Sequence, residues 1–139
     1  MTEQTRPEPP VSEVSQPFWD ATRSGQLLMQ WCSTCERVVF YPRAICPGCL
    51  GDTLEWRPSR GTGRVYAVTV EQRQLDPRFP LRAPYAIALV DLDDGGRMLS
   101  NVVECDPASV TVGMPVTVTW EPLSDGRRLP QFVPVRSDA

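Results

Sequence analysis

The feature that most constrains this chain is a set of four cysteines arranged in two pairs. Cys32, Cys35, Cys46 and Cys49 follow the pattern C-x2-C-x10-C-x2-C. Two short strands and a turn fit around these pairs and bring the four thiolates to one point. Four thiolates at tetrahedral spacing suit zinc, with iron as the second choice. A closed site of this kind leaves no open position for substrate, so we expect a structural metal. The alternative is a group of buried or redox-active thiols.

The residues beside the cysteines affect the charge and the backbone of this site. Four thiolates around a divalent cation carry a net charge of about −2. Arg37 and Arg43 flank the cysteines and are candidates to offset that charge, the alternative being plain surface solubility. Glu36 follows the first pair where glycine is common, because the backbone there is often left-handed. Gly48 and Gly51 are expected to serve the second pair.

The chain contains no histidine and no lysine. Their absence excludes Ser-His-Asp and Cys-His catalytic units, a lysine Schiff base and a Walker-type phosphate loop. An enzyme made from this chain alone would have to use Asp, Glu, Tyr, Arg, Ser or Cys. Cys105, the one cysteine outside the pairs, is expected to be a small buried or half-buried apolar residue. The net charge of −3 argues against general binding to nucleic acid or anionic membranes.

The first part of the chain predicts a polar lead, one short helix and three short strands. Residues 1–14 are polar and rich in proline, which predicts a disordered or extended segment. Ser15 can cap a helix over 16–24, with Pro17 in its first turn and Gly25 at its end. Strands are predicted at 27–32, 38–42 and 53–56, with the cysteine pairs between them.

The second part has the period-two pattern of β-strands. A strand over 64–73 places Tyr66, Val68 and Val70 on one face. Residues 85–92 are apolar on both faces, which predicts a fully buried strand. The DDGG sequence at 93–96 predicts a hairpin turn into a return strand over 97–105.

Two further strands complete this part. The strand over 114–122 alternates, with Val116, Val118 and Trp120 inward. The strand over 128–135 carries Pro130 and Pro134, which restrict it to a sheet edge or to loose pairing.

Five antiparallel strands without a helix long enough for a parallel crossover predict a small barrel, and the OB-fold is the leading candidate. The predicted fold is therefore mainly β: a short N-terminal helix, a rubredoxin-like zinc ribbon and a five-stranded OB-fold barrel. The predicted division is a lead at 1–14, the helix and ribbon at 15–60, and the barrel at 61–136. Loops 74–84 and 123–128, which OB-folds commonly use to grip ligands, each hold two arginines.

The order of helix, ribbon and barrel resembles a known family. The matching stretches are PFWDATRSGQLLMQWCSTCERVVFYPRAICPGC, GTGRVYAVTV, PYAIALVDLDDGGRMLSNVVE, VGMPVTVTWEP and LPQFVPV. They cover roughly residues 16–135. On these stretches the chain resembles the zinc-ribbon and OB-fold proteins first named as a domain of unknown function and now linked to acyl-CoA metabolism. The cysteine spacing with PFWD and YPRAICPGC is the most specific part.

The resemblance implies a function as well as a fold. Members are similar to small accessory subunits that bind thiolase-like enzymes, lipid-transfer-type aldolases or MaoC-like hydratases. They act as scaffolds and help to hold acyl-CoA. Some take part in bacterial steroid side-chain breakdown, where retro-aldol cleavage of a CoA thioester needs both subunits. The resemblance thus implies a non-catalytic subunit of a hetero-oligomer, with structural zinc and a partner that supplies the catalytic residues.

Candidate residues can be assigned to these roles. The phosphates of CoA favour arginine and its adenine favours a flat stacking surface. The candidate contacts to CoA are Arg37, Tyr41 and Arg43 on the ribbon and Arg78, Phe79 and Arg82 on the first barrel loop. A plain solvated surface is the alternative for both groups.

Large aromatic and arginine side chains are favoured interface anchors. The candidate contacts to the partner are Phe18, Trp19, Arg23 and Trp31. The helix that carries Phe18 and Trp19 is too short to be stable alone and must dock on something. The alternative is that these aromatics pack inside the chain.

Three other functions stay open. Ribbon and OB-fold together also occur in proteins that bind single-stranded nucleic acid, which is the main alternative. An electron carrier with iron in the ribbon and an enzyme using barrel-loop carboxylates are the others. The start of the chain has no apolar segment typical of a signal peptide, and the longest apolar run, YAIALV, is far short of the ~20 residues needed to cross a bilayer. We therefore expect a cytoplasmic protein with reduced thiols.

Overall fold

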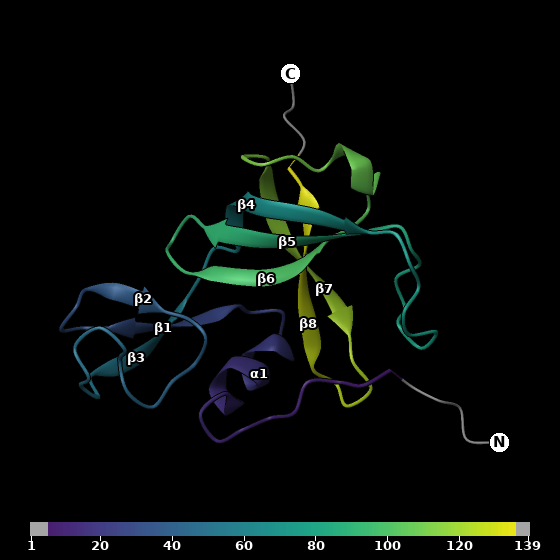
Figure 1. Cartoon of the computed structure of the whole chain (residues 1–139). Coiled ribbons are helices and arrows are strands. Elements are labelled where there is room, and N and C mark those ends of the chain that lie inside the picture. Colours follow the sequence, from purple (N-terminus) through teal and green to yellow (C-terminus); the bar gives the residue numbers. More distant parts are fainter. Residues whose placement is uncertain (1–5, 136–139) are drawn as a thin grey trace.

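The computed structural model describes residues 6–135 and contains a small ribbon sheet and a barrel (Figure 1). The ribbon consists of β1 (Leu28–Cys32), β2 (Arg37–Val39) and β3 (Leu54–Pro58). Its strands are antiparallel in the order β2-β1-β3. The three predicted strands are therefore present, although β2 ends at Val39 and not at residue 42.

Strand β2 ends early because the chain turns toward the barrel. Tyr41 Oη accepts a hydrogen bond from the Leu99 backbone N–H at 3.1 Å. Two residues later, the buried Gln30 side chain bonds both backbone groups of Arg43, at 2.7 Å to its N–H and 2.8 Å to its C=O. These bonds replace sheet pairing over residues 40–43; the bond from Leu99 attaches the ribbon to the barrel, and those of Gln30 hold the segment to β1.

The barrel is closed and has the strand order β4-β5-β6-β8-β7. Its strands are β4 (Thr62–Glu71), β5 (Tyr85–Leu92), β6 (Arg97–Val102), β7 (Pro115–Pro122) and β8 (Arg128–Pro134). A single 3-10 turn, η1 (Pro107–Ser109), lies between β6 and β7. Counted within the barrel the order is 1-2-3-5-4, with a parallel contact between the third and fifth strands. This is the OB-fold, as predicted.

Strand β8 is neither an edge strand nor fully paired on both sides. It pairs with β7 along its whole length, from Arg128 to Pro134. It meets β6 at one register position, Val102 opposite Phe132. The prediction of loose pairing therefore holds on the β6 side, where β6 and β8 diverge.

The core lies on the inner face of the barrel. Phe132 is fully buried at its centre, and Val116, Val118 and Trp120 of β7 point inward as predicted. Strand β5 differs from the prediction, because burial alternates strictly along it. Its alanines, Val90 and Leu92 are buried, whereas its other face is only partly covered.

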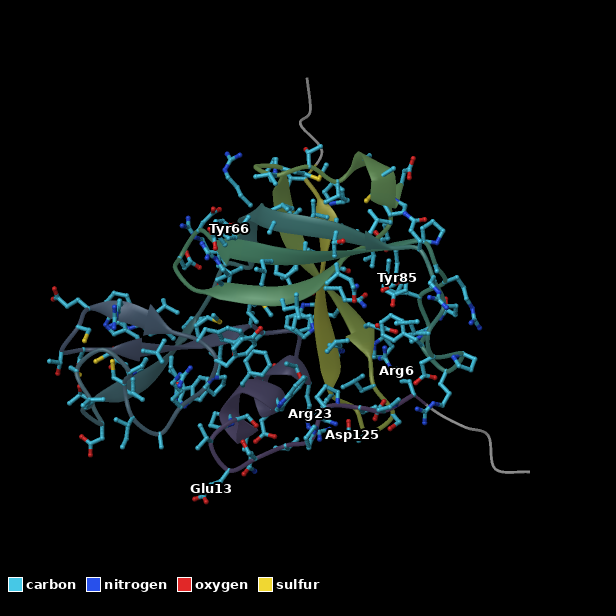
Figure 2. All side chains as sticks on the ribbon, viewed as in Figure 1. Arg6, Glu13, Arg23, Tyr66, Tyr85 and Asp125 are labelled. Atoms are coloured by element: carbon cyan, nitrogen blue, oxygen red, sulfur yellow. The ribbon has the colours of Figure 1, made fainter. Side chains whose placement is uncertain are left out.

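Strand β4 also differs from the prediction at one residue. Its register with β5 shifts between Val65 and Ala67, which is a β-bulge at Tyr66. Val65 is therefore buried, and Tyr66 is 50% exposed on the outer face (Figure 2). The simple alternation that placed Tyr66 with Val68 and Val70 is wrong because the bulge interrupts it.

Helix α1 (Gln16–Thr22) docks within the chain, between β1 and the start of β8. Phe18 and Trp19 are 5% and 9% exposed and meet edge to face at 5.1 Å. Burying a large apolar side chain contributes about 1.5–3 kcal/mol, which offsets the weak stability of seven helical residues. The helix ends at Thr22, two residues before the predicted end, and Ser15 bonds to Ser12 instead of capping it.

The described part of the lead, residues 6–14, contains no helix or strand, and residues 6–9 lie against the barrel. Three polar contacts hold them: Arg6 Nη1 to Glu121 Oε2 at 3.2 Å, Ser124 Oγ to Glu8 Oε1 at 2.6 Å, and Arg127 Nη1 to Pro9 O at 2.8 Å. Residues 1–5 and 136 of the predicted lead and barrel lie outside the described residues. Within residues 6–135, no helix is long and apolar enough to cross a membrane.

Asp94, in the turn between β5 and β6, joins the ribbon to the barrel. Its carboxylate accepts hydrogen bonds from Ser59 Oγ (2.9 Å), Arg60 N (2.7 Å) and Arg60 Nε (3.1 Å), all in the segment that connects the two sheets. Gly95 and Gly96 of the same turn approach Val38 of β2 so closely that a Cβ on either would crowd it. The DDGG turn therefore also fixes the position of the ribbon.

We expect Asp94→Ala to lower the free energy of unfolding by about 1–3 kcal/mol, because the half-buried Ser59 hydroxyl and the exposed Arg60 donors lose a charged acceptor. These hydrogen bonds, first that from Arg60 N–H, lower the pKa of Asp94. A carboxyl group whose pKa is lower in the folded state stabilises the fold at pH values above its unfolded-state pKa of about 3.9. This stabilisation is lost as the pH falls through the folded-state pKa. Urea unfolding at pH 7 and pH 3 measures both effects, with the exposed Asp93→Ala as control. Equal losses for the two variants would contradict this role.

Candidate functional site

The four paired cysteines meet at one point at the tip of the ribbon. Their sulfur atoms all lie within 4.8 Å of one another. Cys32 and Cys49 are 3.7 Å apart, and Cys35 and Cys46 are 3.8 Å apart, measured between Sγ atoms. Sulfurs bound tetrahedrally to zinc at about 2.3 Å lie about 3.8 Å from one another. The predicted metal site is confirmed as four cysteines positioned to bind a metal ion.

The two cysteine pairs have the same backbone geometry. The residue after each pair is left-handed, with φ of 54° at Glu36 and 61° at Leu50. The N–H of Glu36 donates to Cys32 O at 2.7 Å, and the N–H of Leu50 donates to Cys46 O at 2.8 Å. The left-handed position of the second pair is therefore Leu50, and the expectation that Gly48 and Gly51 would provide it is wrong.

The thiols carry the electrostatic signature of a cation site. The backbone N–H of Cys35 lowers the pKa of Cys32 to about 6, and the N–H of Cys49 lowers that of Cys46. Contact with the Cys49 thiol raises the pKa of Cys35 to about 12. Four thiols this close cannot all ionise without a cation, and a divalent ion removes that conflict.

The ribbon has almost no apolar core of its own at this end. Its buried cluster contains Cys32, Val39 and Cys46, with Cys35 and Leu54 packed against them. Three of these five residues are metal ligands. A bound ion would therefore stand in for the missing core, and with four protein ligands it would have no open position for catalysis.

Comparison with known proteins agrees with this geometry. A model of the rubredoxin-like zinc ribbon domain of ChsH2 matches residues 19–55, and a model of the C-terminal OB-fold domain of ChsH2 matches residues 56–121. The structure of an Ltp2-ChsH2(DUF35) aldolase superposes with a TM-score of 0.81 at 30% identity, over 91% of this chain and 98% of that chain. The chain belongs to the DUF35 family.

Relatives of this DUF35 chain have different lengths. A DUF35 domain-containing scaffold protein of Methanothermobacter thermautotrophicus is 37% identical over 64% of this chain and 67% of its own length. A probable enoyl-CoA hydratase alpha subunit of Thermomonospora curvata is 31% identical over 93% of this chain. The DUF35 chain spans only 40% of that hydratase subunit.

The ribbon residues predicted to contact CoA point to different neighbours in the DUF35 chain. The guanidinium of Arg37 lies against Gly48 beside the metal site. Tyr41 is 50% exposed, and its hydroxyl is bonded to the barrel at Leu99. Arg43 has an exposed side chain on a fixed backbone. Arg37, Tyr41 and Arg43 thus have three different sets of neighbours, and their contact with CoA stays a prediction.

The loop residues predicted to contact CoA lie in the connection between β4 and β5. Arg78 makes a two-pronged ion pair with Asp76, at 3.0 Å and 2.8 Å, so a phosphate would have to displace a carboxylate. Arg82 donates only a long bond of 3.4 Å, to Pro77 O. Phe79 stacks near Tyr85, with ring centroids 5.2 Å apart.

The residues predicted to contact a partner are mostly engaged within the chain. Phe18 and Trp19 are buried, as described above. Arg23 Nη1 donates to Asp125 O at 2.6 Å, and the two residues lie together in Figure 2. Trp31 is half-buried under the guanidinium of Arg57, 4.4 Å from its ring. The helix therefore docks on its own barrel, and contact of these four side chains with another protein stays a prediction.

Sequence reasoning missed an apolar surface on the barrel. Ile87 and Leu89 of β5 are half-buried on its outer face, and Leu99 of β6 is 57% exposed beside them. A hollow of 260 Å³ and another of 370 Å³ meet at Leu99, Leu129 and Pro130. We call this surface, made by Ile87, Leu89, Leu99, Leu129 and Pro130, the apolar face. The sequence of residues 85–92 indicated this surface, because the strand is apolar on both faces, but we had predicted that both faces would be buried.

Proposed function

We propose that this DUF35 chain is a non-catalytic accessory subunit that docks on a thiolase-like aldolase or a related acyl-CoA enzyme. The observation that carries the proposal is the apolar face. It occupies β5 and β6 between loops 74–84 and 123–128, which is where OB-folds bind their ligands. Leu99 is exposed on this face, Ile87, Leu89 and Leu129 are half-buried, and Pro130 is buried beneath them. A contiguous apolar patch that stays open to solvent on a folded domain marks an interaction site.

One arginine of each loop beside the apolar face is engaged within the chain. Arg78, on the first loop, is paired with Asp76. Arg127, on the second, is 5% exposed, stacked 4.9 Å from Trp19 and bonded to Asp125. Arg82 and Arg128, the other arginines of these loops, are exposed. A ligand with negative charge, such as a single-stranded nucleic acid, is therefore the alternative for this surface. Burying the 57% of Leu99 that is exposed would contribute about 1–2 kcal/mol at an interface.

Two further facts support a partner that supplies the chemistry. The chain has no histidine or lysine. Histidine titrates near neutral pH, and lysine does so where its surroundings lower its pKa, so both often act as catalytic acids or bases. The names of similar proteins point the same way, because they describe a scaffold protein, a hydratase subunit and an Ltp2-ChsH2(DUF35) aldolase.

The finer part of the proposal concerns the substrate. The partner would act on a CoA thioester, and the family resemblance implies a steroid or another bulky acyl group. Arg43 and Arg82 are the better candidates for the CoA phosphates, because Arg37 and Arg78 are already engaged. The geometry supports this ranking and leaves the acyl group to experiment.

We expect Leu99→Glu to weaken the complex at least about 30-fold, the effect of removing an interface anchor. The variant should be co-expressed with a tagged thiolase-like or hydratase subunit encoded beside this chain, and co-purification measured. Val112→Glu is the matched control, because Val112 is 69% exposed and lies outside the apolar face. Wild type and V112E should co-purify and L99E should not. Equal recovery of L99E would reject the apolar face as the docking site, and no recovery of wild type with either enzyme class would reject the function.

A further inference from the structure

The metal site has a close cationic neighbour that the proposed function does not use. Gly48, between the two cysteines of the second pair, is not left-handed. A Cβ built there would overlap the Arg37 side chain, with the guanidinium Cζ only 2.8 Å away and Nε 3.3 Å away. Glycine at this position therefore makes room for a guanidinium that lies directly against the backbone of the cysteine loop.

Arg37 connects the two halves of the metal site. It is the first residue of β2 and pairs in register with Cys32, the first ligand. Its side chain reaches Gly48, whose N–H donates to the sulfur of Cys46 at 3.3 Å. The backbone of Arg37 thus lies opposite the ligand Cys32, and its guanidinium lies against the Gly48 peptide, which donates a hydrogen bond to the ligand Cys46.

Two other arginines lie in the ribbon: Arg43 has an exposed side chain, and Arg57 is engaged elsewhere. Arg57 forms an ion pair with Glu55 and covers Trp31. Within residues 6–135, the ion pairs do not include Arg37. Its guanidinium lies beside Gly48, which stands between the ligands Cys46 and Cys49, and the set of four thiolates carries a net charge of about −2 with a divalent ion bound.

From these observations we infer that Arg37 is the counter-ion of the metal site and slows release of the bound ion, and that Gly48 is required to admit it. The guanidinium favours the charged, metal-bound state over the open state by Coulomb attraction. It is a positioning residue, because it acts on the metal through the cysteine loop. This role also explains why Arg37 is poorly suited to hold CoA phosphates.

The test is the rate of zinc release from the full chain to a chromogenic chelator. We expect Arg37→Gln to release zinc about tenfold faster, the lower end of what residues around metal ligands contribute, because Arg37 is exposed. Gly48→Ala should have a similar effect, since its methyl group displaces the guanidinium. The double variant should be no faster than either single one. Arg37→Lys, which keeps the charge, should recover part of the loss.

Arg57→Gln is the matched control, because it removes the same charge from the same sheet. We expect it to leave zinc release unchanged. Circular dichroism of each zinc-loaded variant confirms that the ribbon is folded before release begins. The inference is overturned if R37Q and R57Q release zinc at the same rate, or if the effects of R37Q and G48A multiply in the double variant.

Discussion

Removal of the metal should unfold the ribbon of this chain and leave its barrel folded. The metal end of the ribbon has a buried cluster of three residues, two of them ligands. The main core includes Phe132, Val90 and Val116 of the barrel, all fully buried, and Met29 of β1 packs into it from the end of the ribbon away from the metal site. Structural zinc contributes on the order of 10–16 kcal/mol in small zinc-dependent peptides, more than the rest of this ribbon can supply.

Amide hydrogen exchange on the full chain, with and without a strong chelator, measures this directly. Protection should be lost across residues 28–58 and kept across the barrel strands. Cys46→Ser should give the same pattern, because it removes a fully buried ligand. Cys105→Ser is the control: Cys105 is half-buried, packs against the barrel and lies outside the site. Unchanged protection of the ribbon after chelation would show that the ion does not stabilise it.

The metal site and the barrel order were predictable because simple local rules determine them. Ligand spacing alone brings Cys32, Cys35, Cys46 and Cys49 together, whatever the rest of the chain does. The alternation of Val116, Val118 and Trp120 follows directly from the pleat of a strand. The DDGG turn needs left-handed backbone, which Gly95 and Gly96 supply with φ of 107° and 95°.

The errors arose where tertiary contacts override local patterns. The bulge at Tyr66 depends on strand β5 as much as on β4, so no periodicity within β4 could reveal it. Residues 85–92 are apolar on both faces, and only the folded chain shows that one of these faces stays open. Leu50 adopts a left-handed backbone because its N–H is bonded to Cys46 O, a local bond that outweighs its intrinsic preference.

The burial of Arg127 was not predictable from its loop. It is held by Trp19, Asp125 and Pro9, which come from the helix, the loop and the lead. The helix and the lead lie near the start of the chain, far from Arg127 in the sequence. The burial of Phe18 and Trp19 was unpredictable for the same reason, because they pack against strands that come later in the chain.

Efficient turnover of an acyl-CoA substrate should require both this chain and its partner enzyme. In the proposed function the reacting groups belong to the partner. An accessory subunit that docks through the apolar face can order the partner's substrate site, and small misplacements there cost about 100-fold in rate. Omission of this chain should therefore lower kcat/KM by about that factor.

The same assay tests the CoA part of the proposal. Arg82→Ala and Arg43→Ala should raise KM for the CoA thioester and leave kcat unchanged, because a phosphate contact far from the reacting carbon contributes to binding alone. Arg78→Ala is the control, since its guanidinium is already paired with Asp76. Unchanged KM in the first two variants would place CoA entirely on the partner.

The most direct test of the account is a reconstitution with separately purified subunits. Cleavage or hydration of a steroid or other bulky acyl-CoA is followed for this chain alone, for the partner alone and for the mixture. We predict no turnover by this chain, weak turnover by the partner, and about 100-fold higher kcat/KM for the mixture. Turnover by this chain alone, or equal rates for the partner with and without it, would contradict an accessory role.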